Sequence, residues 1–186
     1  MFKIIVIFAY LAVACYGAPQ EQSGVYCGNT PDQIYKCLNN PMIVSRHEKC
    51  SRLTSKCEKM TCIFRESNWL DGTAVNKAKL TAHFDQYAKN HPEWSPAVQH
   101  LKSACLGSEL KTQGVYLNCP SYDIIHCALS SFIKHATPSQ WLTTEECAYP
   151  RAYATSCPVC PDECYAPQIP LNSCNACYSQ SLPQTP

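Results

Sequence analysis

The sequence predicts an all-α protein of about six helices, cross-linked by disulfides. Apolar residues recur at helical spacing along several segments, whereas strand signals are nearly absent. Cysteine accounts for 15 of the 186 residues, far more than a typical soluble protein contains. We expect the helices to enclose an apolar cavity and to be followed by an irregular C-terminal extension rich in proline and cysteine.

Residues 1–17 have the layout of a secretory signal peptide. Lys3 supplies a positive charge, an apolar run extends from Ile4 to Val13, and the small residues Cys15 and Gly17 precede a predicted cut after Gly17. A membrane anchor would need roughly 20 apolar residues. We therefore expect a secreted, extracellular protein without membrane insertion.

Cleavage at this point would leave 169 residues with 14 basic side chains, 14 acidic side chains and 14 cysteines. A balanced charge argues against a nucleic-acid partner, because phosphate binding needs a basic excess or patch. An even cysteine count in an exported chain indicates disulfides, of which 14 cysteines allow up to seven.

Helical signals begin at Thr30-Pro31, which fits an N-cap followed by proline in the first turn. This short helix should stop before Pro41. Residues 45–64 then place apolar side chains on one helical face. These side chains belong to Cys50, Leu53, Cys57, Met60 and Phe64.

Asp71-Gly72 predicts a turn, and the next helix should run to the breaker at Asn90-His91-Pro92. Ser95-Pro96 is a start signal for another helix. Each of the two helices has one apolar stripe. The stripes consist of Leu80, Phe84 and Tyr87 in the first helix, and of Val98, Leu101 and Cys105 in the second.

The clearest helix spans 121–135, with Ser121 as its cap and Thr137-Pro138 as its end. A last helix should begin at Thr143, because Thr143 and Glu146 fit the capping-box pattern. The apolar positions of the 121–135 helix are Ile124, Ile125, Ala128, Leu129, Phe132 and Ile133.

From Cys157 onward, prolines exclude a regular helix. We divide the chain into a signal peptide at 1–17, a helical domain at 18–156 and a disulfide-rich extension at 157–186 that packs on the same domain. The extension contains two Cys-x-x-Cys pairs, which a zinc site could also use. An oxidising compartment favours disulfides, so we expect no metal. The pairs are Cys157 with Cys160 and Cys174 with Cys177.

No catalytic motif is visible, so we expect no enzyme activity and no cofactor. His126 lies beside Cys127, but neighbouring side chains on a helix point about 100° apart, and the cysteine should be oxidised. Six histidines are scattered without a metal-binding spacing. Glu145-Glu146 fits the start of a helix, where negative charge is favourable.

Aromatic and aliphatic side chains gather on the predicted inner faces of the helices. Such a set is more often simply the core, but helices held apart by disulfides could instead enclose an apolar ligand. The candidate ligand contacts are Phe84, Tyr87, Leu101, Tyr122, Ile125, Leu129, Phe132 and Trp141.

The order and spacing of six cysteines resemble those of insect odorant-binding proteins. In that ladder, a close second–third pair is followed by a long gap and a close fifth–sixth pair. The segment from Cys62 to Leu80 also resembles the family, and the additional cysteines with the Cys157-Pro158 step resemble its cysteine-rich Plus-C subgroup. The six cysteines are Cys27, Cys57, Cys62, Cys105, Cys119 and Cys127.

The resemblance implies disulfides that join Cys27 to Cys62, Cys57 to Cys119 and Cys105 to Cys127. Two further cysteines leave alternatives open, since Cys37 could replace Cys27 and Cys147 could compete for a place. The resemblance also implies a carrier of odorants or semiochemicals, with a chemosensory receptor and a second copy of the chain as further partners. Family members often release their ligand with pH, which the scattered histidines would allow.

Two other classes of function fit the sequence. A secreted protease inhibitor would present the cysteine-rich extension as a cross-linked binding loop. A structural extracellular protein would have a filled core and no affinity for apolar probes.

Overall fold

The structure, a computed structural model, describes residues 25, 31, 34–39, 43–44, 47–107, 110 and 118–157. The predicted signal peptide, Cys27 and the extension after Cys157 lie outside the described residues. None of the described helices is long and apolar enough to cross a membrane.

Six α-helices dominate the described chain, with four short 3₁₀ helices and one small hairpin. This confirms the predicted all-α, disulfide-rich fold. The α-helices are α1 (Glu48–Ser51), α2 (Lys56–Glu66), α3 (Lys77–Asn90), α4 (Ser95–Ala104), α5 (Pro120–Lys134) and α6 (Ala148–Ser156). The hairpin and the 3₁₀ helices are β1 (Leu70–Asp71), β2 (Ala74–Val75), η1 (Ile34–Cys37), η2 (Pro92–Trp94), η3 (Pro138–Gln140) and η4 (Glu145–Cys147).

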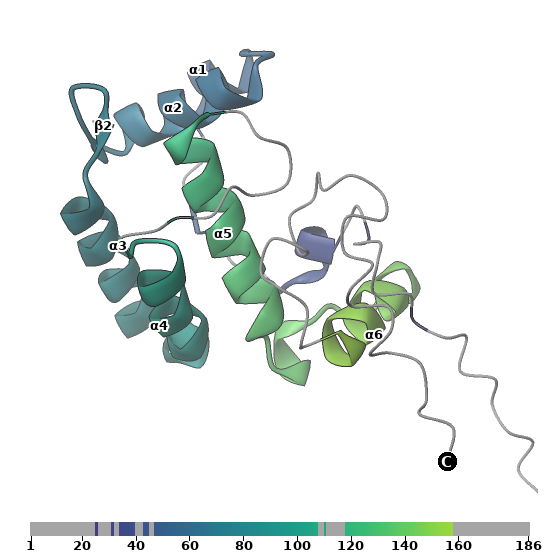
Figure 1. Ribbon diagram of the computed structural model, residues 1–186. Helices are drawn as coiled ribbons and strands as arrows, with labels where there is room; N and C mark the ends of the chain where they lie inside the picture. The colour runs from purple at the N-terminus through teal and green to yellow at the C-terminus, as the bar shows by residue number, and fades with distance from the viewer. Residues whose placement is uncertain are drawn as a thin grey trace, which may run out of the picture.

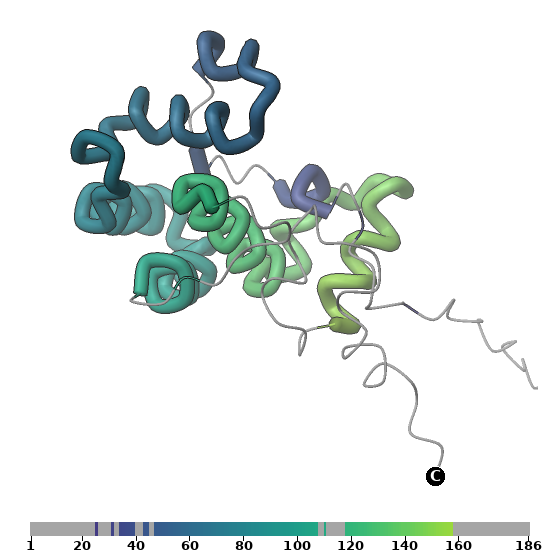
Figure 2. The backbone as a smooth tube through the Cα atoms, turned by 45° about the horizontal axis from the view of Figure 1, so that its top comes forward, coloured from purple at the N-terminus to yellow at the C-terminus, as the bar shows by residue number. Residues whose placement is uncertain are grey.

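Helix α5 runs through the middle of the molecule (Figure 1), with α3 and α4 on one side of it and α6 on the other. Figure 2 shows the same order from a second direction, with α2 crossing near the start of α5. Helices α2, α4 and α6 all contact α5. Twelve of the 15 residues of α5 are buried, which explains why its apolar stripe is wider than that of a surface helix.

Proline sets the start of two central helices. Pro96 lies in the first turn of α4, as predicted from Ser95-Pro96. Helix α5 has Cys119 as its N-cap and Pro120 in its first turn. The prediction that Ser121 caps this helix was wrong, because proline favours the first helical position and Ser121 follows it, buried in the first turn.

The segment 45–64 is not one helix. It divides into α1 and α2, and Leu53 between them is 37% exposed. The Ser55 hydroxyl accepts a hydrogen bond from the Glu58 amide at 3.3 Å and starts α2. A local N-cap therefore overrides the apolar periodicity that runs through the whole segment.

A tight hairpin forms at the predicted Asp71-Gly72 turn. Leu70 pairs with Val75 and Asp71 with Ala74. Gly72 has a φ of +61°, a left-handed conformation that costs little only for glycine. The Asn76 side chain then accepts a hydrogen bond from the Lys79 amide at 2.8 Å and caps α3.

The predicted capping box at Thr143 and Glu146 does not form. The chain enters η4 at Glu145 and begins α6 only at Ala148. A capping box forms earlier instead, where Thr137 and Gln140 cap η3. The pattern of Thr followed three residues later by Glu or Gln occurs at both places, and only the first has its side chains in contact.

Four disulfides connect described residues. Two of them, Cys57–Cys119 and Cys105–Cys127, are pairs that the resemblance implies. The implied Cys27–Cys62 pair was wrong, because the α1–α2 turn places Cys50 beside Cys62 and these two are joined. Cys37 and Cys147, which the sequence left open, pair with each other.

Candidate functional site

The eight predicted ligand contacts lie inside the protein. All except Tyr122 belong to, or pack against, one core cluster. The Phe132 ring lies 5.6 Å from Tyr87 and 4.9 Å from Trp94, measured between ring centroids. Tyr122 is also buried and packs on the His126 ring at 4.0 Å. Contacts this close are those of a packed core, and the role of these residues in ligand binding stays a prediction.

Tyr87 differs from the other seven in having a buried polar atom, its hydroxyl oxygen, that lacks a hydrogen-bond partner in the described part of the chain. Burial, together with the nearby charge of Glu93, raises the pKa of Tyr87 to about 12. A buried hydroxyl without a partner is costly, so Tyr87 is the member of this set best suited to bind a polar ligand group.

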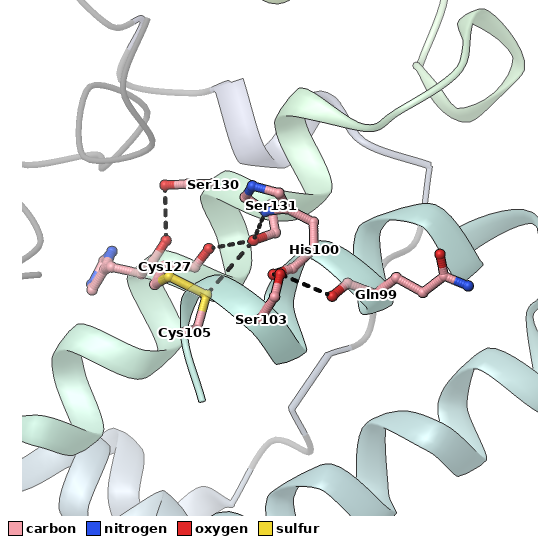
Figure 3. The surroundings of a disulfide bond; sticks show 8 residues. Gln99, His100, Ser103, Cys105, Cys127, Ser130 and Ser131 are labelled. Atoms are coloured by element: carbon pink, nitrogen blue, oxygen red, sulfur yellow. Dashed lines mark hydrogen bonds between the residues drawn. A yellow bond between two sulfur atoms is a disulfide. The ribbon is translucent and has the colours of Figure 1, made fainter. Parts of the chain in front are cut away.

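A serine and a histidine meet between α4 and α5, next to the Cys105–Cys127 disulfide (Figure 3). His100 Nδ1 lies 3.0 Å from the Ser131 hydroxyl, a distance that also occurs in nucleophile–base pairs. However, Ser131 is fully buried and its hydroxyl also donates to the Cys127 carbonyl at 3.0 Å. This geometry joins two helices and gives a substrate no access to the hydroxyl.

Neighbouring His126 and Cys127 likewise form no catalytic pair. Cys127 is in its disulfide, as expected. His126 is 7% exposed, and its Nδ1 has no hydrogen-bond partner within the described part of the chain. Burial and the positive charge of Lys56 lower the pKa of His126 to about 4.

A groove of about 640 Å³ lies where the end of α5 meets α6. Binding sites for small molecules usually measure about 300–1,000 Å³ and are mostly apolar. Seven of the 11 described residues that line it are apolar. We call it the α5–α6 groove. Its described lining is Ile133, Lys134, Ala136, Pro138, Trp141, Ala148, Arg151, Ala152, Ala154, Thr155 and Ser156.

Helix α6 packs against the core with one face and lines the groove with another. Pro150 and Tyr153, three residues apart, are buried. Ala148, Arg151, Ala152 and Thr155 share another face of the helix and line the groove. Two small alanines and a threonine on this face leave room that larger side chains would fill.

The opposite wall of the α5–α6 groove is held by backbone pairing. Trp141 forms an isolated bridge with Leu38, and the Leu142 amide donates to the Cys37 carbonyl at 2.8 Å. Gln140 Nε2 donates to the Glu93 carbonyl at 3.1 Å. Together with the Cys37–Cys147 disulfide, these bonds fix the segment between α5 and α6.

Sequence reasoning identified one groove residue, Trp141, among its ligand contacts. It missed Arg151 and the alanines of α6, although the spacing of Ala148, Arg151, Ala152 and Thr155 places them on one helical face. The groove could not be predicted because it depends on the position of α6 beside α5, and no local sequence pattern specifies how two helices pack.

Two other hollows lie elsewhere on the described part of the chain. One of about 370 Å³ lies between α1 and α2, where His47, Glu48 and Lys59 contribute polar groups. The other, of about 490 Å³, has Thr144, Glu145 and Glu146 as its described lining. Both are smaller than the α5–α6 groove, and the described lining of the second is entirely polar.

The described residues contain no group of three His, Cys, Asp or Glu side chains that could hold a metal ion. Cys157, one of the cysteines that a zinc site would need, is disulfide-bonded.

Comparisons with models of protein families, with curated proteins and with solved structures find no match to this chain.

Proposed function

We propose that the protein binds a small hydrophobic ligand in the α5–α6 groove and carries it through extracellular fluid. The observation that carries this proposal is the groove itself, which combines a suitable volume with a mainly apolar lining. The firmly held wall at Trp141 supports it further, because a preformed site loses less conformational entropy on binding.

Secretion is supported by the signal-peptide pattern at residues 1–17 and by the disulfides, which persist in oxidising compartments. The resemblance of the cysteine ladder to odorant-binding proteins favours odorants or other semiochemicals as the cargo. It also favours a chemosensory receptor as the recipient.

The test is titration of oxidised protein, residues 18–186, with the fluorescent probe N-phenyl-1-naphthylamine. We expect saturable binding at micromolar concentration, reversed by small hydrophobic competitors. The variant Ala152→Trp fills the groove and should weaken probe binding at least about tenfold, since a blocked pocket loses its apolar contact area.

The matched control is Ala82→Trp, which adds the same side chain at an exposed position of α3. It should bind the probe like the unmodified protein. No probe binding by the folded, oxidised protein would overturn the proposed function. If Ala152→Trp binds the probe as tightly as the unmodified protein, the ligand does not bind in this groove.

A further inference from the structure

Among the described residues that line the α5–α6 groove, the charged ones are Lys134 and Arg151, and both are cationic. No carboxylate occurs in its described lining. The acidic residues closest in sequence to Arg151, Glu145 and Glu146, line a different hollow together with Thr144. The described lining therefore combines an apolar surface with positive charge.

Arg151 is held in position at the groove. Its Nη1 donates a hydrogen bond to the Leu142 carbonyl at 2.9 Å, across from α6 to the segment that carries Trp141. This bond uses one of the five N–H donors of the guanidinium.

A guanidinium beside an apolar surface fits a ligand with an anionic head and a hydrocarbon body. Arginine binds carboxylates through two parallel N–H···O bonds in one plane, which makes the contact selective. These bonds are stronger than neutral ones because both partners are charged. Lys134, on the neighbouring wall, adds positive charge at the end of α5. Trp141 and Ala152 offer the surface on which an alkyl chain would pack.

We infer that the α5–α6 groove selects amphipathic carboxylates, with the carboxylate at Arg151 and the alkyl chain along Trp141 and the small residues of α6. This inference rests on the proposed function and specifies its ligand class. A groove of about 640 Å³ suits a single small molecule.

The test compares dodecanoate with dodecanol as competitors of N-phenyl-1-naphthylamine, below the critical micelle concentration and at pH 8. The two ligands share an alkyl chain and differ in the charge of the head. We expect the unmodified protein to bind dodecanoate about five- to tenfold more tightly, the effect of one partly exposed charge-assisted contact.

The variant Arg151→Gln should abolish this preference while leaving dodecanol affinity within about twofold. Arg151→Lys should restore part of it, because a lysine keeps the charge without the planar geometry. The matched control, Arg65→Gln, removes the same charge from an exposed position of α2, near the far end of α5 from α6 (Figure 1), and should keep the preference. If Arg151→Gln fails to fold, Lys134→Gln provides a second test and should reduce the preference.

The outcomes separate the two proposals. Equal affinity of the unmodified protein for dodecanoate and dodecanol would overturn the carboxylate inference and leave the proposed function standing. A preference that survives in the folded Arg151→Gln variant would also overturn it. Binding of neither competitor and no binding of the probe would overturn the proposed function itself.

Discussion

Burial and the nearby charge of Lys56 lower the pKa of His126 from 6.5 to about 4. The imidazole packs against the Tyr122 ring on α5 and stays neutral in the folded protein near pH 7. Because its pKa is lower in the folded chain than in the unfolded chain, only the unfolded chain binds a proton between these two values. Stability from this residue is therefore fully present above pH 6.5 and falls as the pH drops toward about 4.

The shift from 6.5 to about 4 corresponds to a loss of about 3 kcal/mol in the free energy of unfolding across that pH range. Replacing His126 with Phe removes the titrating group and keeps an aromatic ring beside Tyr122. We predict that the His126→Phe variant loses about 2 kcal/mol less stability than the unmodified protein between pH 7 and pH 4.5.

Urea unfolding at the two pH values measures this difference. The control Ala82→Phe adds the same ring at an exposed position of α3 and replaces no titrating group, so it should leave the pH dependence as it is. If His126→Phe and the unmodified protein lose the same stability between the two pH values, burial does not disfavour protonation of His126.

At the scale of elements, two disulfides that differ in sequence separation cross-link different parts of the molecule. Cys37–Cys147 joins η1 to η4, directly before α6, across a sequence separation of 110 residues. Cys50–Cys62 joins α1 to α2 across a separation of 12 residues. Only the first fixes the wall of the α5–α6 groove that contains Trp141.

We predict that the double variant Cys37→Ala/Cys147→Ala loses about 2 kcal/mol more stability than Cys50→Ala/Cys62→Ala, since cross-links that close longer loops restrict the unfolded chain more. It should also bind N-phenyl-1-naphthylamine less tightly, whereas Cys50→Ala/Cys62→Ala should retain probe affinity. Urea unfolding and probe titration measure the two effects. Equal loss of affinity in both variants would contradict the assigned role of the first disulfide.

Elements with strong local signals were predictable. Pro96 and the stripe from Leu80 to Tyr87 mark α4 and α3, because a helix start and an apolar face are properties of a short segment. The break between α1 and α2 was missed because Leu53 continues the apolar pattern although it is exposed. The Ser55 cap, with Glu58 three residues later, was the local signal that could have revealed it.

At the scale of the whole molecule, tertiary placement decides where a ligand can bind. The sequence predicts apolar inner faces, and the structure packs Phe84, Leu101 and Phe132 of those faces into a closed core. The α5–α6 groove instead depends on how the segment around Trp141 crosses back to Leu38 and how α6 lies beside α5. These are long-range relationships, which residue periodicity does not encode.

The central claim is that a small hydrophobic ligand binds in the α5–α6 groove, and amide NMR shifts during a titration with dodecanoate test it most directly. We predict that the perturbed amides include those of Ala136, Trp141 and Ala152. Perturbations confined to Phe84, Tyr87 and Leu101 would contradict the claim and place the ligand in the core, next to the buried Tyr87 hydroxyl.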